Sequence, residues 1–177
     1  GCTVCSTPDT YATYEFSDST VSTGVVVSTI KETSSSTTAT ISSNDSLGGT
    51  DATYTFSVTP TLAIPTEGVI VLTVPSGVTV PSDSAAFFTM SCSSGCTTAG
   101  TMSYDSGTRE LTILNSFGSY LLGSNTLTFD ITGWTNPTDT STYEFSLATF
   151  FNDGSSYQGI ENFTGLELGA ADGACYV

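Results

Sequence analysis

Two cysteines in the middle of the chain have a spacing that favours a local disulfide. Cys92 and Cys96 flank Ser93-Ser94-Gly95, a turn sequence that can bring two Cβ atoms within bridging distance. A zinc site formed by this pair with Cys2 and Cys5 is the alternative, because both spacings suit tetrahedral zinc. The disulfide is favoured, since the sequence contains no histidine and an oxidising compartment consumes free thiols.

The remaining cysteines lie near the two ends of the sequence. Cys2, Cys5 and Cys175 bring the total to five, and an odd count in a secreted chain suggests a free thiol or a bond to another molecule. Cys175 could bond to Cys2 or Cys5 of a second subunit, which would join subunits head to tail into a filament. Alternatively, the chain is a piece of a longer protein, which the first residue, Gly1, would suit, and the partner cysteines lie in neighbouring modules.

Enzymatic chemistry has little support in these residues. Without histidine the chain cannot form a Ser-His or Cys-His nucleophile or a histidine-bound metal site. Glu15, Glu144 and Glu161 could meet in space as the carboxylate pair of a glycoside hydrolase, but no motif singles them out. We therefore expect a protein that is not an enzyme, with no catalytic residue and no cofactor.

Calcium would be the most credible metal, because oxygen ligands are abundant at the expected turns. Asn152-Asp153-Gly154-Ser155 supplies such oxygens, as do Asp45 and Asp51. The same residue types are the ordinary composition of turns, and no EF-hand spacing occurs. We expect turn chemistry at these positions and no metal site.

Charge excludes two classes of partner. Lys31 and Arg109 are the two basic residues against 17 acidic ones, and the net charge is −15. Binding nucleic acid requires several basic side chains to displace counterions, and an anionic membrane surface would repel this chain. No window of the sequence is apolar enough for a transmembrane helix. We expect no nucleic-acid partner and no membrane insertion.

Serine and threonine make up roughly a third of the residues, well above ordinary usage. With cysteine pairs and few lysines, this composition indicates an extracellular or cell-surface location. Two sequons predict N-glycans, and the Ser/Thr tract at 33–38 predicts O-glycans, although a flexible linker would have the same composition. The expected glycosylated residues are Asn44, Asn162, Ser34, Ser35, Ser36, Thr37 and Thr38.

The elements that must position these residues are β-strands, because no stretch has a sustained helical period. Aromatic and β-branched residues alternate with Ser and Thr at 51–60, 125–132 and 141–150. This alternation predicts strands with one buried and one solvated face.

A central strand and a hairpin complete the expected fold. Residues 67–74 are more continuously apolar, which favours a central strand. Thr101 to Tyr104 and Arg109 to Leu114 flank Asp105-Ser106-Gly107, and this arrangement predicts a hairpin. Many short strands between Pro and Gly turns predict an all-β antiparallel sandwich.

We expect three parts along the chain. Residues 1–36 would form an N-terminal arm with strand-like pieces and the Ser/Thr-rich linker, 37–169 the sandwich, and 170–177 a tail that contains Cys175. The arm could pair with its own sheet or add a strand to the edge of a neighbour. Thr-Tyr-x-Phe-Ser occurs at 13–17 and twice more in the sandwich, which reflects ordinary strand chemistry or a preceding related module.

A longer pattern covers the block from Thr38 to Thr164. It consists of Thr53-Tyr54-Thr55-Phe56-Ser57, Ile64-Pro65-Thr66-Glu67-Gly68-Val69-Ile70-Val71-Leu72-Thr73-Val74-Pro75-Ser76-Gly77, Cys92 with Cys96, Phe129-Asp130-Ile131-Thr132-Gly133-Trp134-Thr135-Asn136-Pro137, and Thr142-Tyr143-Glu144-Phe145-Ser146. The block resembles a β-sandwich repeat of very large secreted surface proteins of ciliates and related protists. In those proteins such modules alternate with Cys-rich, growth-factor-receptor-like repeats. The resemblance implies an immunoglobulin-like fold and a role in surface coats or extracellular fibres, and it carries over no functional residues.

The resulting expectation is a structural subunit of a glycosylated extracellular fibre or cell-surface coat. Subunits would self-associate head to tail through terminal cysteines, strand addition or both. The alternative is an adhesion or carbohydrate-binding module in which an exposed aromatic residue, Trp134 or Tyr157, stacks on a sugar. For Trp134 the favoured interpretation is a core residue.

Overall fold

The computed structural model of the chain describes residues 35–36, 38–81, 89–96 and 100–169. Within these ranges the chain forms strands and no helix, so no helix there is able to cross a membrane. The strands are β1 (Ser35–Ser36), β2 (Ala39–Ser43), β3 (Asp51–Val58), β4 (Gly68–Thr73), β5 (Thr89–Ser94), β6 (Thr101–Asp105), β7 (Glu110–Leu114), β8 (Leu127–Thr135), β9 (Tyr143–Asn152) and β10 (Tyr157–Leu168).

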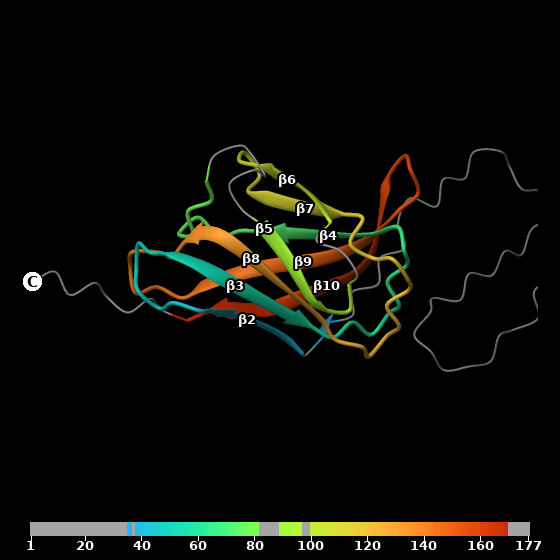
Figure 1. The fold of residues 1–177 in the computed structure, drawn as a ribbon, viewed down its shortest axis with the longest axis horizontal. Helices are drawn as coiled ribbons and strands as arrows, with labels where there is room; N and C mark the ends of the chain where they lie inside the picture. The colour runs from blue at the N-terminus through green and yellow to red at the C-terminus, as the bar shows by residue number, and fades with distance from the viewer. Residues whose placement is uncertain (1–34, 37, 82–88, 97–99, 170–177) are drawn as a thin grey trace, which may run out of the picture.

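The strands form two sheets that pack face to face, so the predicted all-β sandwich is confirmed (Figure 1). One sheet has the order β2-β3-β8-β5 and the other the order β1-β10-β9-β4-β7-β6. Apart from β1 and the β6–β7 hairpin, the strands follow the immunoglobulin connectivity, with ABED in one sheet and CFG in the other. The β6–β7 hairpin is inserted between the equivalents of D and E and extends the second sheet beyond β4.

The alternation of residue types in the strands places aromatic rings between the sheets. In β3, the buried residues Tyr54 and Phe56 alternate with half-buried threonine and serine. Phe145 of β9 lies opposite them, with its ring centroid 5.6 Å from that of Phe56 and 6.0 Å from that of Tyr54. Phe129 stacks on Phe56 at 5.2 Å, and the core is therefore built largely from aromatic packing.

The predicted central strand and the predicted hairpin are both present. β4 lies between β9 and β7, and β6 pairs with β7 from Thr101 to Asp105. Asp105 Oδ1 accepts a hydrogen bond from Gly107 N at 2.7 Å and fixes the turn. Arg109 then adopts a φ of 58°, and its guanidinium donates to three carbonyl groups of the segment 74–78. This basic residue therefore has a structural role in the sandwich.

One predicted boundary differs from the structure. Ser35–Ser36 was expected in a linker, but it forms β1 and pairs in parallel with Asn162 and Phe163 of β10. The sandwich therefore includes residues N-terminal to 37, because the backbone N–H and C=O groups of an open sheet edge can pair with any extended segment, whatever its side chains. The expected strands of the arm and the tail 170–177 lie outside the described residues.

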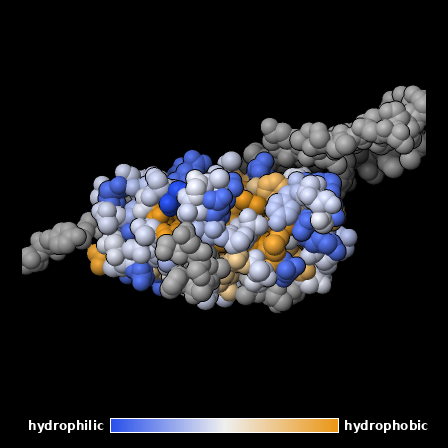
Figure 2. Space-filling view, turned by 90° about the horizontal axis from the view of Figure 1, so that it is seen from above, coloured by the Kyte–Doolittle hydropathy of each residue, from blue (hydrophilic) through white to orange (hydrophobic). Residues whose placement is uncertain are grey.

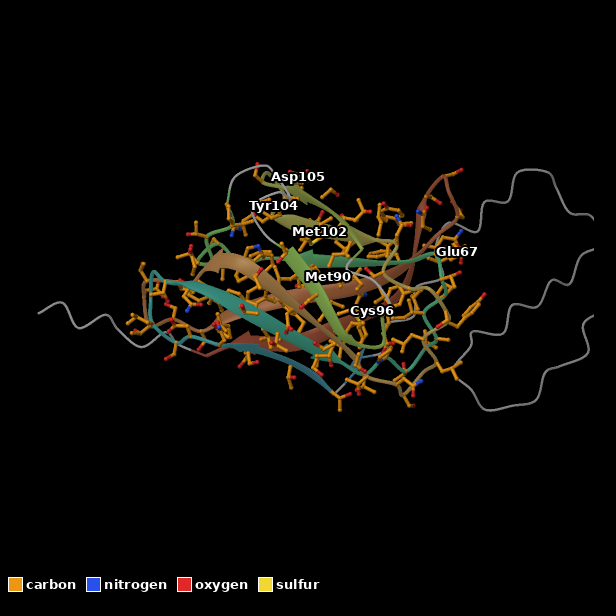
Figure 3. The ribbon with its side chains drawn as sticks, in the orientation of Figure 1. Glu67, Met90, Cys96, Met102, Tyr104 and Asp105 are labelled. Atoms are coloured by element: carbon orange, nitrogen blue, oxygen red, sulfur yellow. A yellow bond between two sulfur atoms is a disulfide. The ribbon has the colours of Figure 1, made fainter. Side chains whose placement is uncertain are left out.

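The two open sides of the sandwich, where the edges of the two sheets face each other, are covered by different strands. On one side β2 lies against β10. On the other side the edge strands β5 and β6 supply Met90, Met102 and Tyr104, which pack against the core from the two sheets (Figure 3). Figure 2 views the molecule from above and shows apolar surface in patches among polar residues.

Candidate functional site

The outer face of the β2-β3-β8-β5 sheet is covered by hydroxyl groups. Asp130 lies near its centre, where Oδ1 accepts a hydrogen bond from Thr55 at 2.6 Å and Oδ2 accepts longer ones from Ser91 and Ser93 at 3.4 Å. The outward residues that form hydrogen bonds between the side chains of neighbouring strands are Thr55, Ser57, Thr89, Ser91, Ser93, Thr128, Asp130 and Thr132. This face is polar, and none of its four strands contains a lysine or an arginine, so it suits a surface that stays in solvent.

A buried carboxylate connects the two sheets at one end of the sandwich. Glu161 of β10 is 1% exposed. Its oxygens accept hydrogen bonds from Thr61 N at 2.9 Å, from Thr61 Oγ1 at 3.0 Å and from Leu62 N at 3.3 Å. A β-bulge between Gly159 and Glu161 accompanies this inward position. The carboxylate thus holds the segment that follows β3, and its hydrogen bonds show a structural role.

A buried amide joins a loop to its own sheet at the opposite end of the sandwich. Asn136, 3% exposed, accepts a hydrogen bond from the Tyr54 hydroxyl at 2.7 Å and donates to the carbonyls of Asp45 and Leu47. Burial raises the pKa of Tyr54. This network fixes the loop between β2 and β3, which carries one of the two sequons.

The turn between β9 and β10 is ordered by one carboxylate. Asp153 accepts hydrogen bonds from Ser155 N at 2.8 Å, Ser156 N at 2.7 Å, Ser156 Oγ at 3.0 Å and Gln158 Nε2 at 3.0 Å. The backbone amides of Ser155 and Ser156 lower the pKa of Asp153. This is the turn chemistry expected at 152–155, with the donors already occupying the oxygens that calcium would need.

Two hollows flank this turn and form the most promising candidate site. One encloses about 490 Å³ and is lined by residues that include Glu67, Val69, Leu114 and Asn152. The other encloses about 410 Å³ and runs from Asn152 through the turn to Tyr157. Glu67 lies at the end of the molecule that carries the β9–β10 turn (Figure 3). The Glu67 carboxylate lines the first hollow and the Tyr157 ring the second, and the two hollows adjoin at Asn152 and Gly154, which line both.

The two aromatic candidates for sugar stacking have opposite positions. Trp134 is fully buried, with its ring 5.5 Å from that of Tyr54, so the favoured interpretation as a core residue is confirmed and the alternative as a binding residue is wrong. It lies inward on β8 and packs in the core. Tyr157 is 47% exposed at the start of β10 and remains available.

The cysteines are placed only in part. Cys92 and Cys96 form a disulfide, with their sulfur atoms 2.04 Å apart and their Cα atoms 5.8 Å apart. The bond closes the end of β5 over a turn in which Gly95 has a φ of 77°. Cys2, Cys5 and Cys175 lie outside the described residues.

Both sequon asparagines lie on the surface. Asn44 Oδ1 accepts a hydrogen bond from Thr53 N at 2.7 Å, which leaves the amide nitrogen, the atom that carries a glycan, directed to solvent. Asn162 is exposed on β10. Thr38 is also exposed, whereas Ser34 and Thr37 lie outside the described residues and Ser35 and Ser36 form β1.

The remaining acidic candidates do not come together. Glu144 is exposed on β9, whereas Glu161 faces the core, so these two candidate glutamates do not come together as a carboxylate pair. Asp45 accepts a hydrogen bond from Leu47 N within a turn, and Asp51 accepts one from the Thr135 hydroxyl at the end of a strand. Glu15 lies outside the described ranges, within which no cluster of three or more metal-binding side chains occurs.

Known proteins give no family for this chain. The sequence matches no protein-family model and no curated protein. The collagen-binding domain from a Staphylococcus aureus adhesin is 10% identical with a TM-score of 0.42, covering 77% of this chain and 99% of that one. BslA, a bacterial hydrophobin, is 14% identical with a TM-score of 0.37, covering 72% and 97%. The Actinomyces fimbrial adhesin FimA is 11% identical with a TM-score of 0.35, covering 63% and 45%.

Similarities of this size assign neither a family nor a function. The resemblance to ciliate surface modules stays a prediction, since none of these comparisons bears on it. The buried Glu161 and Asn136 were not expected from the sequence as structural residues. The one local sign of an inward carboxylate was the position of Glu161 directly after Ile160, in a strand whose residue types otherwise alternate.

Proposed function

We propose that this chain is a non-enzymatic structural module of an extracellular fibre or cell-surface coat. The observation that carries the proposal is the direction in which the chain passes through the sandwich. β1 is parallel to β10 and pairs with it at Asn162, and the described chain ends at Gly169, about 23 Å further along the same strand. The first and the last described strands, β1 and β10, therefore run in the same direction within one sheet. With this arrangement, successive copies of the module can follow one another in line.

The surface chemistry supports a location in solvent outside the cell. The hydroxyl face centred on Asp130 presents no basic group, and exposed Asn44 and Asn162 have accessible amides for glycans. A disulfide between Cys92 and Cys96 persists in an oxidising compartment. Mutual repulsion at a net charge of −15 would favour end-to-end rather than lateral association.

Gel electrophoresis of the full chain, made in a secretory host, tests the assembly. Samples without reductant should give a ladder of multimers that collapses to monomer on reduction. Cys175→Ser should abolish the ladder, whereas the matched control Cys92→Ser/Cys96→Ser should retain it. A ladder that survives reduction would remove the disulfide linkage, and monomer alone under both conditions and by light scattering would remove the filament.

Intact mass tests the glycans on the same material. The mass should exceed the sequence mass of 18.3 kDa and should fall after enzymatic removal of N-glycans. Asn44→Gln and Asn162→Gln should each remove one glycan. A mass equal to that of the bare sequence would contradict this part of the proposal.

An adhesive function is the second candidate, and one observation favours it. Tyr157 is an exposed aromatic residue on a concave surface, a position that core packing does not explain. An adhesive module would use this surface to attach the coat or fibre to another cell or matrix. Binding of the full chain to cell or matrix surfaces, compared with a sandwich protein of similar charge, tests this function.

A further inference from the structure

We propose that the concave surface beside the β9–β10 turn binds a neutral saccharide, with Tyr157 as the ring on which a sugar stacks. The inference rests on the adhesive function proposed above and names its ligand class. It does not depend on how the fibre assembles.

The site is a row of residues across adjacent strands. Tyr157 of β10 pairs with Asn152 of β9, and Asn152 N donates to the carbonyl of Glu67 at 3.1 Å, just before β4. Leu114 of β7 lines the hollow on the far side of Glu67. Neighbouring strands lie about 4.8 Å apart, so the row spans about 14 Å and can hold a short oligosaccharide.

The aromatic platform is held in place. The Tyr157 ring lies 6.3 Å from the Phe150 ring, at an interplanar angle of 42°, which limits its rotation. Tyr157 is nevertheless 47% exposed and lines the hollow. A pyranose ring presents a face of C–H groups with partial positive charge, and such a face is attracted to the negative face of an aromatic ring.

Polar groups that suit sugar hydroxyls lie along the row that begins at this platform, Asn152 on the adjacent strand and Glu67 one strand further. Asn152 Oδ1 accepts a hydrogen bond from Gly154 N at 2.9 Å, which fixes the side chain while its amide NH₂ makes no hydrogen bond within the described residues. The Glu67 carboxylate accepts hydrogen bonds from the Thr66 hydroxyl at 2.7 Å and from its own backbone N–H, and its two oxygens have further lone pairs that can accept from a ligand. Together they offer a donor and an acceptor, the pair that a sugar hydroxyl can use.

The turn that shapes the site is rigid before any ligand arrives. Asp153 receives four hydrogen bonds from the turn and from Gln158, so Tyr157 is flanked by residues that are already fixed. Binding then requires little ordering of the loop, which improves affinity for a small ligand.

The negative charge of the carboxylates at the site determines which class of saccharide can bind. Glu67 and Asp153 are carboxylates whose pKa values are lowered by hydrogen bonds, the first mainly from Thr66 and the second mainly from Ser155, so both are ionised at neutral pH. They repel sialic, uronic or sulfated sugars. Bound calcium is the competing occupant, but it would have to displace the four donors that surround Asp153.

A glycan array followed by calorimetric titration of the full chain tests the inference. Neutral oligosaccharides should bind and their sialylated or sulfated counterparts should not. Tyr157→Ala should weaken binding on the order of tenfold, Tyr157→Phe should retain most of it, and the matched control Tyr120→Ala should leave it unchanged. Tyr120 is suitable because it is 65% exposed and lines neither hollow. Thermal unfolding of each variant confirms that the fold is retained.

The outcomes separate this site from the adhesive function. No binding to any neutral glycan, equal binding by wild type and Tyr157→Ala, or binding abolished by a calcium chelator would overturn the saccharide site. Surface attachment that persists in Tyr157→Ala would also overturn it, while the adhesive function would stand. Attachment lost with Tyr157→Ala but retained with Tyr120→Ala would support both.

Discussion

Glu161 offers the sharpest test of how the two sheets are held together. Replacing it with alanine removes the acceptor of the backbone amides of Thr61, which is exposed, and of Leu62, which is half-buried. Water can partly replace the lost acceptor for these two donors, so each lost bond should cost about 1 kcal/mol. The missing side chain also leaves a small cavity, so Glu161→Ala should lower the unfolding free energy by about 2–3 kcal/mol. Such a loss is a large fraction of the stability of a domain of this size.

Glu161→Gln separates the charge from the geometry. The amide oxygen can still accept from the two backbone N–H groups, while the Thr61 hydroxyl can rotate and accept from the new NH₂. The loss should be about 1–2 kcal/mol, because only the charge assistance of these bonds disappears. Glu167→Gln is the matched control on the exposed face of the same strand and should change stability by no more than about 0.5 kcal/mol.

Denaturant unfolding followed by tryptophan fluorescence measures these effects. The chain has a single tryptophan, Trp134, and it is fully buried, so its emission reports on the core. The midpoint should shift without a large change in slope, as expected for a native-state effect. If Glu161→Ala were as stable as Glu167→Gln, the hydrogen bonds of Glu161 would not stabilise the sandwich, and the reasoning would fail.

Three further predictions can be measured by the same unfolding assay. Tyr54→Phe should cost about 1 kcal/mol at neutral pH through loss of the bond to Asn136. Burial raises the pKa of Tyr54 in the folded state, so above about pH 10 this tyrosine ionises first in the unfolded chain and the unfolding free energy should fall as pH rises. Tyr54→Phe should reduce this fall. Identical pH profiles for the two proteins would contradict the assignment of the fall to Tyr54. Replacing the Cys92–Cys96 bond by two serines should cost about 2 kcal/mol, since the closed loop is short, and a loss near 5 kcal/mol would indicate a wider role. Gly77→Ala should cost about 1–3 kcal/mol because its Cβ meets the Tyr143 ring, and the cost should shrink in a Tyr143→Ala background; an equal cost in both backgrounds would exclude this clash as the cause.

Part of the candidate site could be predicted from the sequence, and part could not. The exposed Tyr157 was among the aromatic residues proposed for sugar binding, and the turn chemistry at Asn152-Asp153-Gly154 follows from residue types. Glu67, over 80 residues earlier, had no local sign of belonging to the same surface. It reaches the turn because β4 pairs with β9, and pairing partners are chosen by packing of whole faces rather than by neighbours in the chain.

The amino-acid sequence alone determined the fold class, the strand pattern and the absence of histidine chemistry. Alternation with a period of two is a local property, and it assigns Tyr54, Phe56 and Phe129 to a buried face without knowledge of the partner strand. Only the tertiary structure decided the order of strands, the burial of Trp134 and the inward position of Glu161. These three features depend on which strand surfaces meet across the sandwich. Contacts between residues far apart in the chain decide this, and the alternation within one strand carries no information about which strand it will contact.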